Sequence, residues 1–352
     1  MADRLEYSPE ELLSSVAYDE PLIANRVRCH GGFVGGRYQS PRSVGRGAAI
    51  AAWQAQLRAR GVRLIEIPAT LVPPHYPNAA QAVLLLREGV QAPLVRTLTT
   101  IAIIEGFGAM IRDQRVPDLS RCVRESIAGT ATAHLIGGLF EAHARDEAGH
   151  RSEGGHKQMW EAARDLALDN PPVPPDVLMR LMGGRRSGGG RQRLFPELAE
   201  AFEELLAVMV NVLVIEVFAA DTFAWAETVL GDAEVSRAPR EAAAMVGYIR
   251  SDETPHVEYL RTSLSELRAC TLLGENGSEW RGAEVVDRLL TRTLRVLTTE
   301  RPRLQREETH DDIAAALAGH RDAAGVQRRF DALAQPWSAP DWEHDPPRVS
   351  PA

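Results

Sequence analysis

The strongest constraint on this 352-residue chain is a five-residue pattern, Asp-Glu-x-x-His, that occurs twice, at residues 146–150 and 252–256. On a helix, residues three apart share a face, so each copy would present one carboxylate and one imidazole in the same direction. With ordinary residue usage, two chance copies are expected in about one chain in a thousand of this length. The repeat therefore predicts a buried metal site rather than a solvated surface.

Two further glutamates, Glu105 and Glu216, each stand alone in an apolar stretch with a phenylalanine two residues later. Their helical neighbours are apolar, so we expect both glutamates to face a core. A buried carboxylate is costly unless it is protonated, hydrogen-bonded or bound to a metal. From these surroundings alone, both a neutral or arginine-paired acid and a metal ligand remain open.

The order of the residues indicates an internal duplication. Glu147 follows Glu105 by 42 residues, Glu216 comes 69 residues later, and Glu253 comes 37 after that. A step near forty fits an antiparallel helix hairpin, and the longer step fits a crossover between two hairpins. The sequence predicts helices over 92–113, 119 to about 151, 196–230 and 239 to about 273.

This pattern resembles the ferritin-like di-iron carboxylate proteins, in which two helices each give one Glu and two others each give Glu-x-x-His. The resemblance covers roughly residues 92–271. It implies an all-α fold, a ferritin-like four-helix bundle with a long crossover and with N- and C-terminal helical extensions. The expected divisions are an N-terminal extension with one helix (1–76), the di-metal bundle (77–273), and C-terminal helices with a loose tail (274–352).

The same resemblance implies a metal-binding and catalytic role for six residues. One metal would be held mainly by Glu105, Glu147 and His150, the other mainly by Glu216, Glu253 and His256, with Glu147 and Glu253 as bridges.

Three more residues are candidates beside these ligands. Asp146 and Asp252 match the aspartate that precedes a ligand glutamate in bacterial multicomponent monooxygenases and ribonucleotide reductase small subunits. The resemblance implies that each hydrogen-bonds a ligand histidine and fixes its tautomer; the alternative is a solvated helix position. His143 lies four residues before Glu147, on the same face one turn earlier. It could be a seventh metal ligand or a hydrogen-bonded neighbour of the site.

A ligand set rich in carboxylate oxygen suits iron or manganese better than zinc or copper. The resemblance implies two iron ions, with manganese or a mixed pair as variants, and O₂ as co-substrate. The implied reaction is hydroxylation at N or C, or desaturation, of a small organic substrate. We expect an apolar substrate pocket near four aromatic residues, Phe107, Phe140, Phe218 and Phe223.

Composition narrows the expected partners. With 40 basic and 48 acidic residues, the chain has a net charge of −8 and lacks the overall excess of positive charge typical of nucleic-acid binding. The three isolated cysteines favour a reduced, cytoplasmic setting and leave no rubredoxin-like domain, so an external ferredoxin or reductase would supply electrons. The most apolar stretch, residues 205–220, is interrupted by Asn211 and Glu216 and is short for a membrane span. We expect a homodimer without a signal peptide or membrane contact.

Two alternatives remain. One is iron storage or detoxification, as in ferritins and bacterioferritins, whose shorter subunits assemble into cages. The long N-terminal region, the crossover and the C-terminal helices favour a substrate pocket instead. The other alternative is a helical scaffold that binds no metal.

Overall fold

The structure, a computed structural model, describes residues 4–184 and 192–344 and is mostly helical, with 60% helix and 8% strand. This confirms the expected predominance of helix. The elements in chain order are α1 (Pro9–Leu12), β1 (Glu20–Ala24), β2 (Val27–Val34), β3 (Arg37–Gln39), α2 (Val44–Ala59), α3 (Ala79–Arg87), α4 (Ala92–Gly108), α5 (Phe140–Ala148), α6 (His156–Leu168), α7 (Val177–Gly184), α8 (Glu200–Leu230), α9 (Pro239–Arg268), β4 (Thr271–Leu273), β5 (Glu279–Arg281), α10 (Gly282–Thr298), α11 (Glu300–Leu317) and α12 (Ala323–Ala332).

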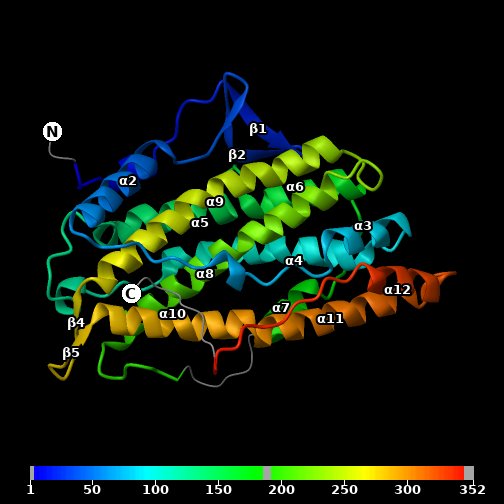
Figure 1. Ribbon diagram of the computed structural model, residues 1–352. Helices are drawn as coiled ribbons and strands as arrows, with labels where there is room; N and C mark the ends of the chain where they lie inside the picture. The colour runs from blue at the N-terminus through cyan, green and yellow to red at the C-terminus, as the bar shows by residue number, and fades with distance from the viewer. Residues whose placement is uncertain (1–3, 185–191, 345–352) are drawn as a thin grey trace.

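The centre of the molecule consists of α4, α8, α9 and the successive pair α5 and α6. The two long helices α8 and α9 pack along each other, α6 contacts both α4 and α9, and α5 also contacts α4 (Figure 1). α8 and α9 are joined by a short turn, so they form the second hairpin that the spacing of Glu216 and Glu253 predicts.

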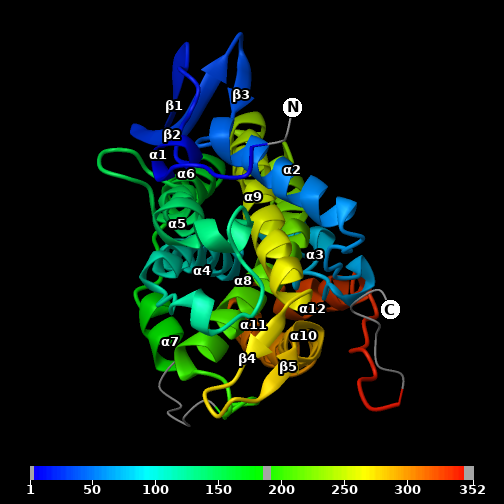
Figure 2. The same ribbon diagram turned by 90° about the vertical axis from the view of Figure 1, so that its left-hand side faces the viewer.

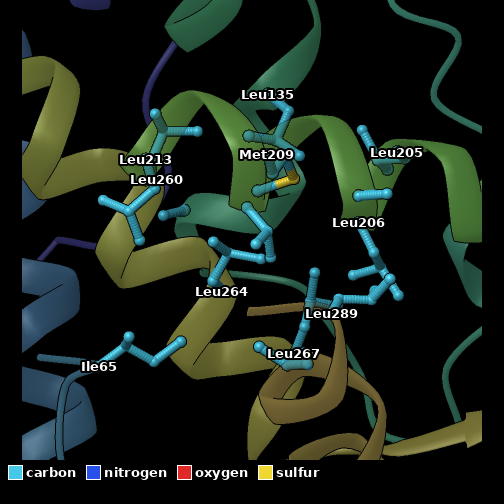
Figure 3. Close-up of a cluster of buried hydrophobic side chains, with 14 of the residues drawn as sticks. Ile65, Leu135, Leu205, Leu206, Met209, Leu213, Leu260, Leu264, Leu267 and Leu289 are labelled. Carbon is cyan, nitrogen blue, oxygen red and sulfur yellow. The ribbon is translucent and has the colours of Figure 1, made fainter. Parts of the chain in front are cut away.

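Two apolar clusters occupy the two ends of this helical core. One contains Met209 and Leu213 of α8 with Leu260 and Leu264 of α9, and Figure 3 shows these side chains meeting. The other contains residues further along α8 and earlier in α9, such as Phe223 and Ile249, together with one face of α4. The glutamates of α8 and α9 fall between the two clusters, so the polar layer is enclosed by apolar packing at both ends.

The helix predicted from residue 119 to about 151 is wrong. Residues 119–134 form bends and short 3₁₀ turns, and a π-helical turn at Leu135–Leu139 contains non-helical dihedral angles at Ile136 and Gly137. The α-helix proper, α5, covers only Phe140–Ala148 and stops at Gly149, whose φ is +82°. The helix therefore ends before the histidine of the first motif.

The N-terminal region also differs from the single helix that we expected. It contains α1, α2 and a three-stranded antiparallel sheet in the order β1-β2-β3, which lies over α6 and one end of α9 (Figure 2). Gly35 and Gly36, at φ +56° and +74°, form the tight turn between β2 and β3. The N–H of His30 in β2 donates to the carbonyl of Gly154 at 2.8 Å, which joins the sheet to the loop between α5 and α6.

The C-terminal region contains the expected helices. The amphipathic helix α10 packs on α8 and α9, and α11 contacts α4 and α12. Trp342 in the segment that follows α12 donates from Nε1 to Thr298 Oγ1 at 3.0 Å, so this part of the expected loose tail is docked on the helices. Residues 345–352 of that tail lie outside the described residues.

Two segments, Ala92–Asp113 and Glu200–Leu230, are long and apolar enough to cross a membrane by length and composition alone. Each also packs within the helical core and carries a glutamate of the polar layer. The cytoplasmic location stays a prediction.

Candidate metal centre

Buried and half-buried carboxylates and imidazoles of the described residues form three groups; His30, His156 and Asp252 make up one, and the two that share Glu147 form the candidate centre. In each group, one ligand atom from every residue lies within 4.8 Å of the others. In the centre, the first group comprises Glu105 of α4, Glu147 of α5, His156 of α6 and Glu253 of α9, and the second comprises His143, Glu147, Glu216 and His256. The four predicted glutamates and one of the two motif histidines are thus brought together.

Two carboxylates lie between the groups. Glu147 belongs to both. Glu253 places Oε1 2.8 Å from Nδ1 of His156 and Oε2 2.7 Å from Nδ1 of His256, so its two oxygens face histidines of different groups. This is the geometry that a bridging carboxylate requires, and it involves the two glutamates for which the family resemblance implied that role.

His150 requires a correction, because it is in neither group. Gly149 turns the chain out of α5, and the backbone of His150 instead pairs with Glu153 in an isolated bridge. The assumption that His150 shares a helical face with Glu147 fails, since the two residues do not belong to one helix. Its side chain is half-exposed, unlike the side chains of the other histidines named above.

His156 occupies the position that we expected for His150. It is the first residue of α6 and is fully buried, with Nδ1 3.4 Å from Glu147 Oε1 and 3.7 Å from Glu105 Oε2. The loop between α5 and α6 is tight and requires glycine at two positions. A Cβ at Gly149 or Gly155 would collide with backbone atoms across the loop. The sequence signal for this loop was the Gly154-Gly155 pair, which indicates a helix break followed by a new helix start.

His143 lies inside the second group. Its Nε2 is 3.3 Å from Glu216 Oε1 and 3.6 Å from Glu147 Oε1, and its ring stacks on that of His256 at 3.9 Å between centroids. The other ring nitrogen, Nδ1, is 3.1 Å from the hydroxyl of Tyr259. His143 thus lies within the centre, as both a seventh ligand and a hydrogen-bonded neighbour of the site would, and its contact with Tyr259 fits either role.

Asp146 and Asp252 are fully buried, which rules out the solvated alternative. Each aspartate lies next to a histidine from the other half of the duplicated pattern. Asp146 Oδ2 is 2.9 Å from His256 Nε2, and Asp252 Oδ2 is 3.6 Å from His156 Nε2. Both imidazoles therefore turn Nε2 toward an aspartate and Nδ1 toward the carboxylates, with which Nδ1 would share a metal.

The N-terminal region supplies the partners of these aspartates. Arg42 Nε and Arg46 Nη1 donate to Asp146 at 2.6 and 2.7 Å. Tyr38 donates its hydroxyl to Asp252 at 2.7 Å, and His30 Nε2 lies 3.1 Å from the same oxygen. Sequence reasoning missed all four residues, because no local pattern connects residues 30–46 with helices more than a hundred residues away.

Several buried polar atoms in the centre make close contacts but no hydrogen bond. His143 Nε2, Glu147 Oε2, His156 Nδ1 and Glu253 Oε1 have no hydrogen bond although they are shielded from solvent. Buried polar atoms are rarely left without a hydrogen bond, and four such atoms in one place are consistent with a bound cation. In each group, carboxylate oxygens and imidazole nitrogens lie close enough together to bind one cation. The two groups therefore fit a pair of divalent cations.

The charges of the centre support the same conclusion. Burial, together with the neighbouring carboxylates, raises the pKa values of Glu105 and Glu216 well above their usual range. Burial opposes a charged imidazole, but Glu253 outweighs it and raises the pKa values of His156 and His256 well above normal. Without metal, these shifts favour the neutral form of the two acids and the charged form of the two imidazoles. Two divalent cations would replace the protons of these groups and balance four carboxylates.

A cavity of about 710 Å³ opens beside the centre between α4, α7, α8 and α11, and Glu105 forms part of its wall. Phe218 and Phe223 also line it. The expectation for the other two aromatic residues was wrong, since Phe107 and Phe140 are not among the lining residues. Phe140 is buried and packs edge-to-face against Tyr259 at 6.3 Å between centroids.

Gly108, the last residue of α4, gives the carboxylate of Glu147 the room that it needs. A Cβ at residue 108 would lie 2.7 Å from Cγ and 2.9 Å from Cδ of Glu147. We expect Gly108→Ala to displace this carboxylate and to weaken metal binding about 10- to 100-fold, the range typical of changes next to a metal ligand. Competition with a metal chelator measures the affinity. Gly47→Ala is the control, because a Cβ there meets nothing within 4 Å; equal affinities in the two variants would contradict this role of Gly108.

We compared the chain with models of known protein families, with curated proteins and with solved structures, and none of these comparisons returned a match.

Proposed function

We propose that this chain is a di-iron oxidoreductase that uses O₂ to oxidise a small organic substrate, on a helical bundle of the ferritin-like kind. The observation that carries the proposal is the pair of ligand groups sharing Glu147, in which four buried polar atoms make no hydrogen bond. Two divalent cations with a common carboxylate fit this arrangement.

The donor set favours iron, or manganese as a variant, because carboxylate oxygen and imidazole nitrogen are the only ligand types in the two groups. A bound iron pair would supply the reduction of O₂ with electrons from an external donor.

The protein's own residues would position and protect this chemistry. Glu147 and Glu253 would keep the two metals together, and Glu105 and His156 would hold the one on the cavity side. Asp146 and Asp252 would orient the imidazoles from behind. The apolar clusters at both ends of the polar layer would limit the access of water to the reaction.

The cavity supports substrate oxidation over iron storage. Its volume lies in the range of small-molecule sites, and apolar side chains such as Ile104 and Phe218 line it next to Glu105. A storage protein has no need of such a chamber beside its metal centre.

Oxygen consumption and iron uptake together test the proposal. Protein loaded anaerobically with Fe(II) should consume O₂ with an added reductant, and ¹⁸O₂ or mass analysis should reveal an oxidised organic product from an accepted substrate. The iron content should stay near two ions per chain when more Fe(II) is supplied with air. Uptake far beyond two ions per chain, without organic product, would favour storage instead.

His143→Ala tests whether the third histidine is a ligand. We expect the variant to retain the ion held by Glu105 and His156 and to bind the second ion at least about tenfold more weakly, because Glu216 and His256 lose their nearest imidazole neighbour. Metal titration followed by the absorption spectrum of Co(II) distinguishes the two ions. A spectrum and an affinity identical to those of the unmodified protein would place His143 outside the coordination.

A further inference from the structure

The wall of the cavity carries acidic side chains, Asp221, Glu308 and Asp312 besides Glu105, and arginines of two kinds. Arg96 and Arg180 are neutralised, since both pair with Asp176 and Asp312 at distances between 2.7 and 3.2 Å. Arg301 makes no hydrogen bond or ion pair with any residue of the described segments. The paired arginines cannot serve a ligand without breaking their own ion pairs, whereas Arg301 can.

Arg301 is placed unfavourably for a cation. It lies in the first turn of α11, where free N–H groups and the helix dipole favour negative charge. Its side chain is exposed, and no carboxylate of the described residues pairs with its guanidinium. An anion in the cavity would relieve these unfavourable contributions together, because it would pair with the guanidinium and meet the helix N-terminus.

A second arginine, alongside the acidic Glu308, belongs to the same wall. Arg306, on the same helix, lies over the rings of Tyr76 and Trp337 at 5.1 and 5.0 Å, and it donates to the carbonyl of Pro74 at 3.1 Å. It has no carboxylate partner among the described residues either. The aromatic contacts hold its guanidinium in place without neutralising it.

One part of the cavity wall is apolar, and this part adjoins the metal centre. Ile101 and Ile104 of α4 and Ile215 and Phe218 of α8 line it, and Glu105 belongs to the same wall. We propose that the substrate is an apolar carboxylic acid whose carboxylate pairs with Arg301 and whose apolar part extends between α4 and α8 toward Glu105. This inference rests on the proposed function, since it assigns the substrate class of that same centre.

Binding of octanoate to the full-length, iron-loaded protein tests the inference. Octanoate should bind more tightly than octan-1-ol by about 10- to 100-fold, the range expected for a charge-assisted hydrogen bond, and octylammonium should bind no better than the alcohol. Octyl phosphate distinguishes a general anion site, where it would bind as well as octanoate, from one suited to a carboxylate. Tighter binding of octyl phosphate would overturn the carboxylic acid as the substrate class.

Arg301→Ala should reduce octanoate affinity to that of octan-1-ol and leave the alcohol unaffected. Arg303→Ala is the matched control, because Arg303 pairs with Glu307 on the exposed side of α11 and does not line the cavity. Octanoate binding that survives Arg301→Ala, for example through direct contact with iron, would overturn the inference.

The iron content of each sample separates this inference from the proposed function. Two ions per chain without Arg301-dependent binding would refute the acid site alone. Arg301-dependent binding in protein that takes up no iron would refute the proposed function and leave the acid site standing.

Discussion

Alanine at residue 156 should abolish tight binding of one metal ion, whereas alanine at residue 150 should leave both ions bound. His156 is fully buried, with Nδ1 2.8 Å from Glu253 and 3.4 Å from Glu147. Mutation of a residue that only hydrogen-bonds a ligand lowers metal affinity about 10- to 100-fold, and loss of the ligand itself should lower it further. His150 is half-exposed and belongs to neither ligand group.

Metal analysis after anaerobic loading and gel filtration measures the outcome for both variants. Circular dichroism of each metal-free protein shows whether the helices are retained, so that a folding defect is not mistaken for a lost ligand. If His150→Ala lost metal and His156→Ala retained it, the loop between α5 and α6 would be placed wrongly, and the helical motif expected from the sequence would be restored.

Asp146→Ala should produce the largest loss of stability of any single carboxylate replacement in the described chain. Its two oxygens meet Arg42, Arg46 and His256, and all four side chains are buried. Removing one partner of a buried ion pair leaves an uncompensated charge, at a cost of about 3–5 kcal/mol. Urea unfolding of the metal-free protein measures the change in the free energy of unfolding without a contribution from bound metal.

Two further variants serve as comparisons for the Asp146→Ala measurement. Asp146→Asn retains the shape and removes the charge, so it should also be destabilised. Glu307→Ala breaks the exposed ion pair with Arg303, which should hardly affect unfolding. A loss below about 1 kcal/mol in Asp146→Ala would show that the arginines find other partners and that Asp146 does not hold the N-terminal region to the centre.

The residues that the sequence located best are those on uninterrupted helices. Glu105, Glu216, Glu253 and His256 lie on α4, α8 and α9, where the 3.6-residue period determines which residues share a face. The bounds of α8 and α9 differ from the expected ones by only a few residues. An isolated glutamate in a long apolar helix is also a signal that requires no knowledge of the tertiary structure.

The first motif was harder, because its last residue lies beyond the end of a helix. The string from Asp146 to His150 has the same letters as the second motif, yet Gly149 takes φ +82° and ends α5. His156 instead of His150 enters the centre because of how the loop between α5 and α6 folds. That loop is held by backbone hydrogen bonds between Gly154 and strand β2. Long-range contacts of this kind, like those of Arg42 and Arg46, leave no periodic trace in the sequence.

The number of metal ions per chain tests the central claim most directly. Full-length protein is loaded anaerobically with excess Fe(II), freed of unbound metal by gel filtration, and analysed for iron and protein. Two ligand groups that share Glu147 predict two ions per chain, with one ion or fewer in Glu147→Ala. Substoichiometric iron in the unmodified protein, or an unchanged count of two in Glu147→Ala, would contradict a di-metal centre at this position.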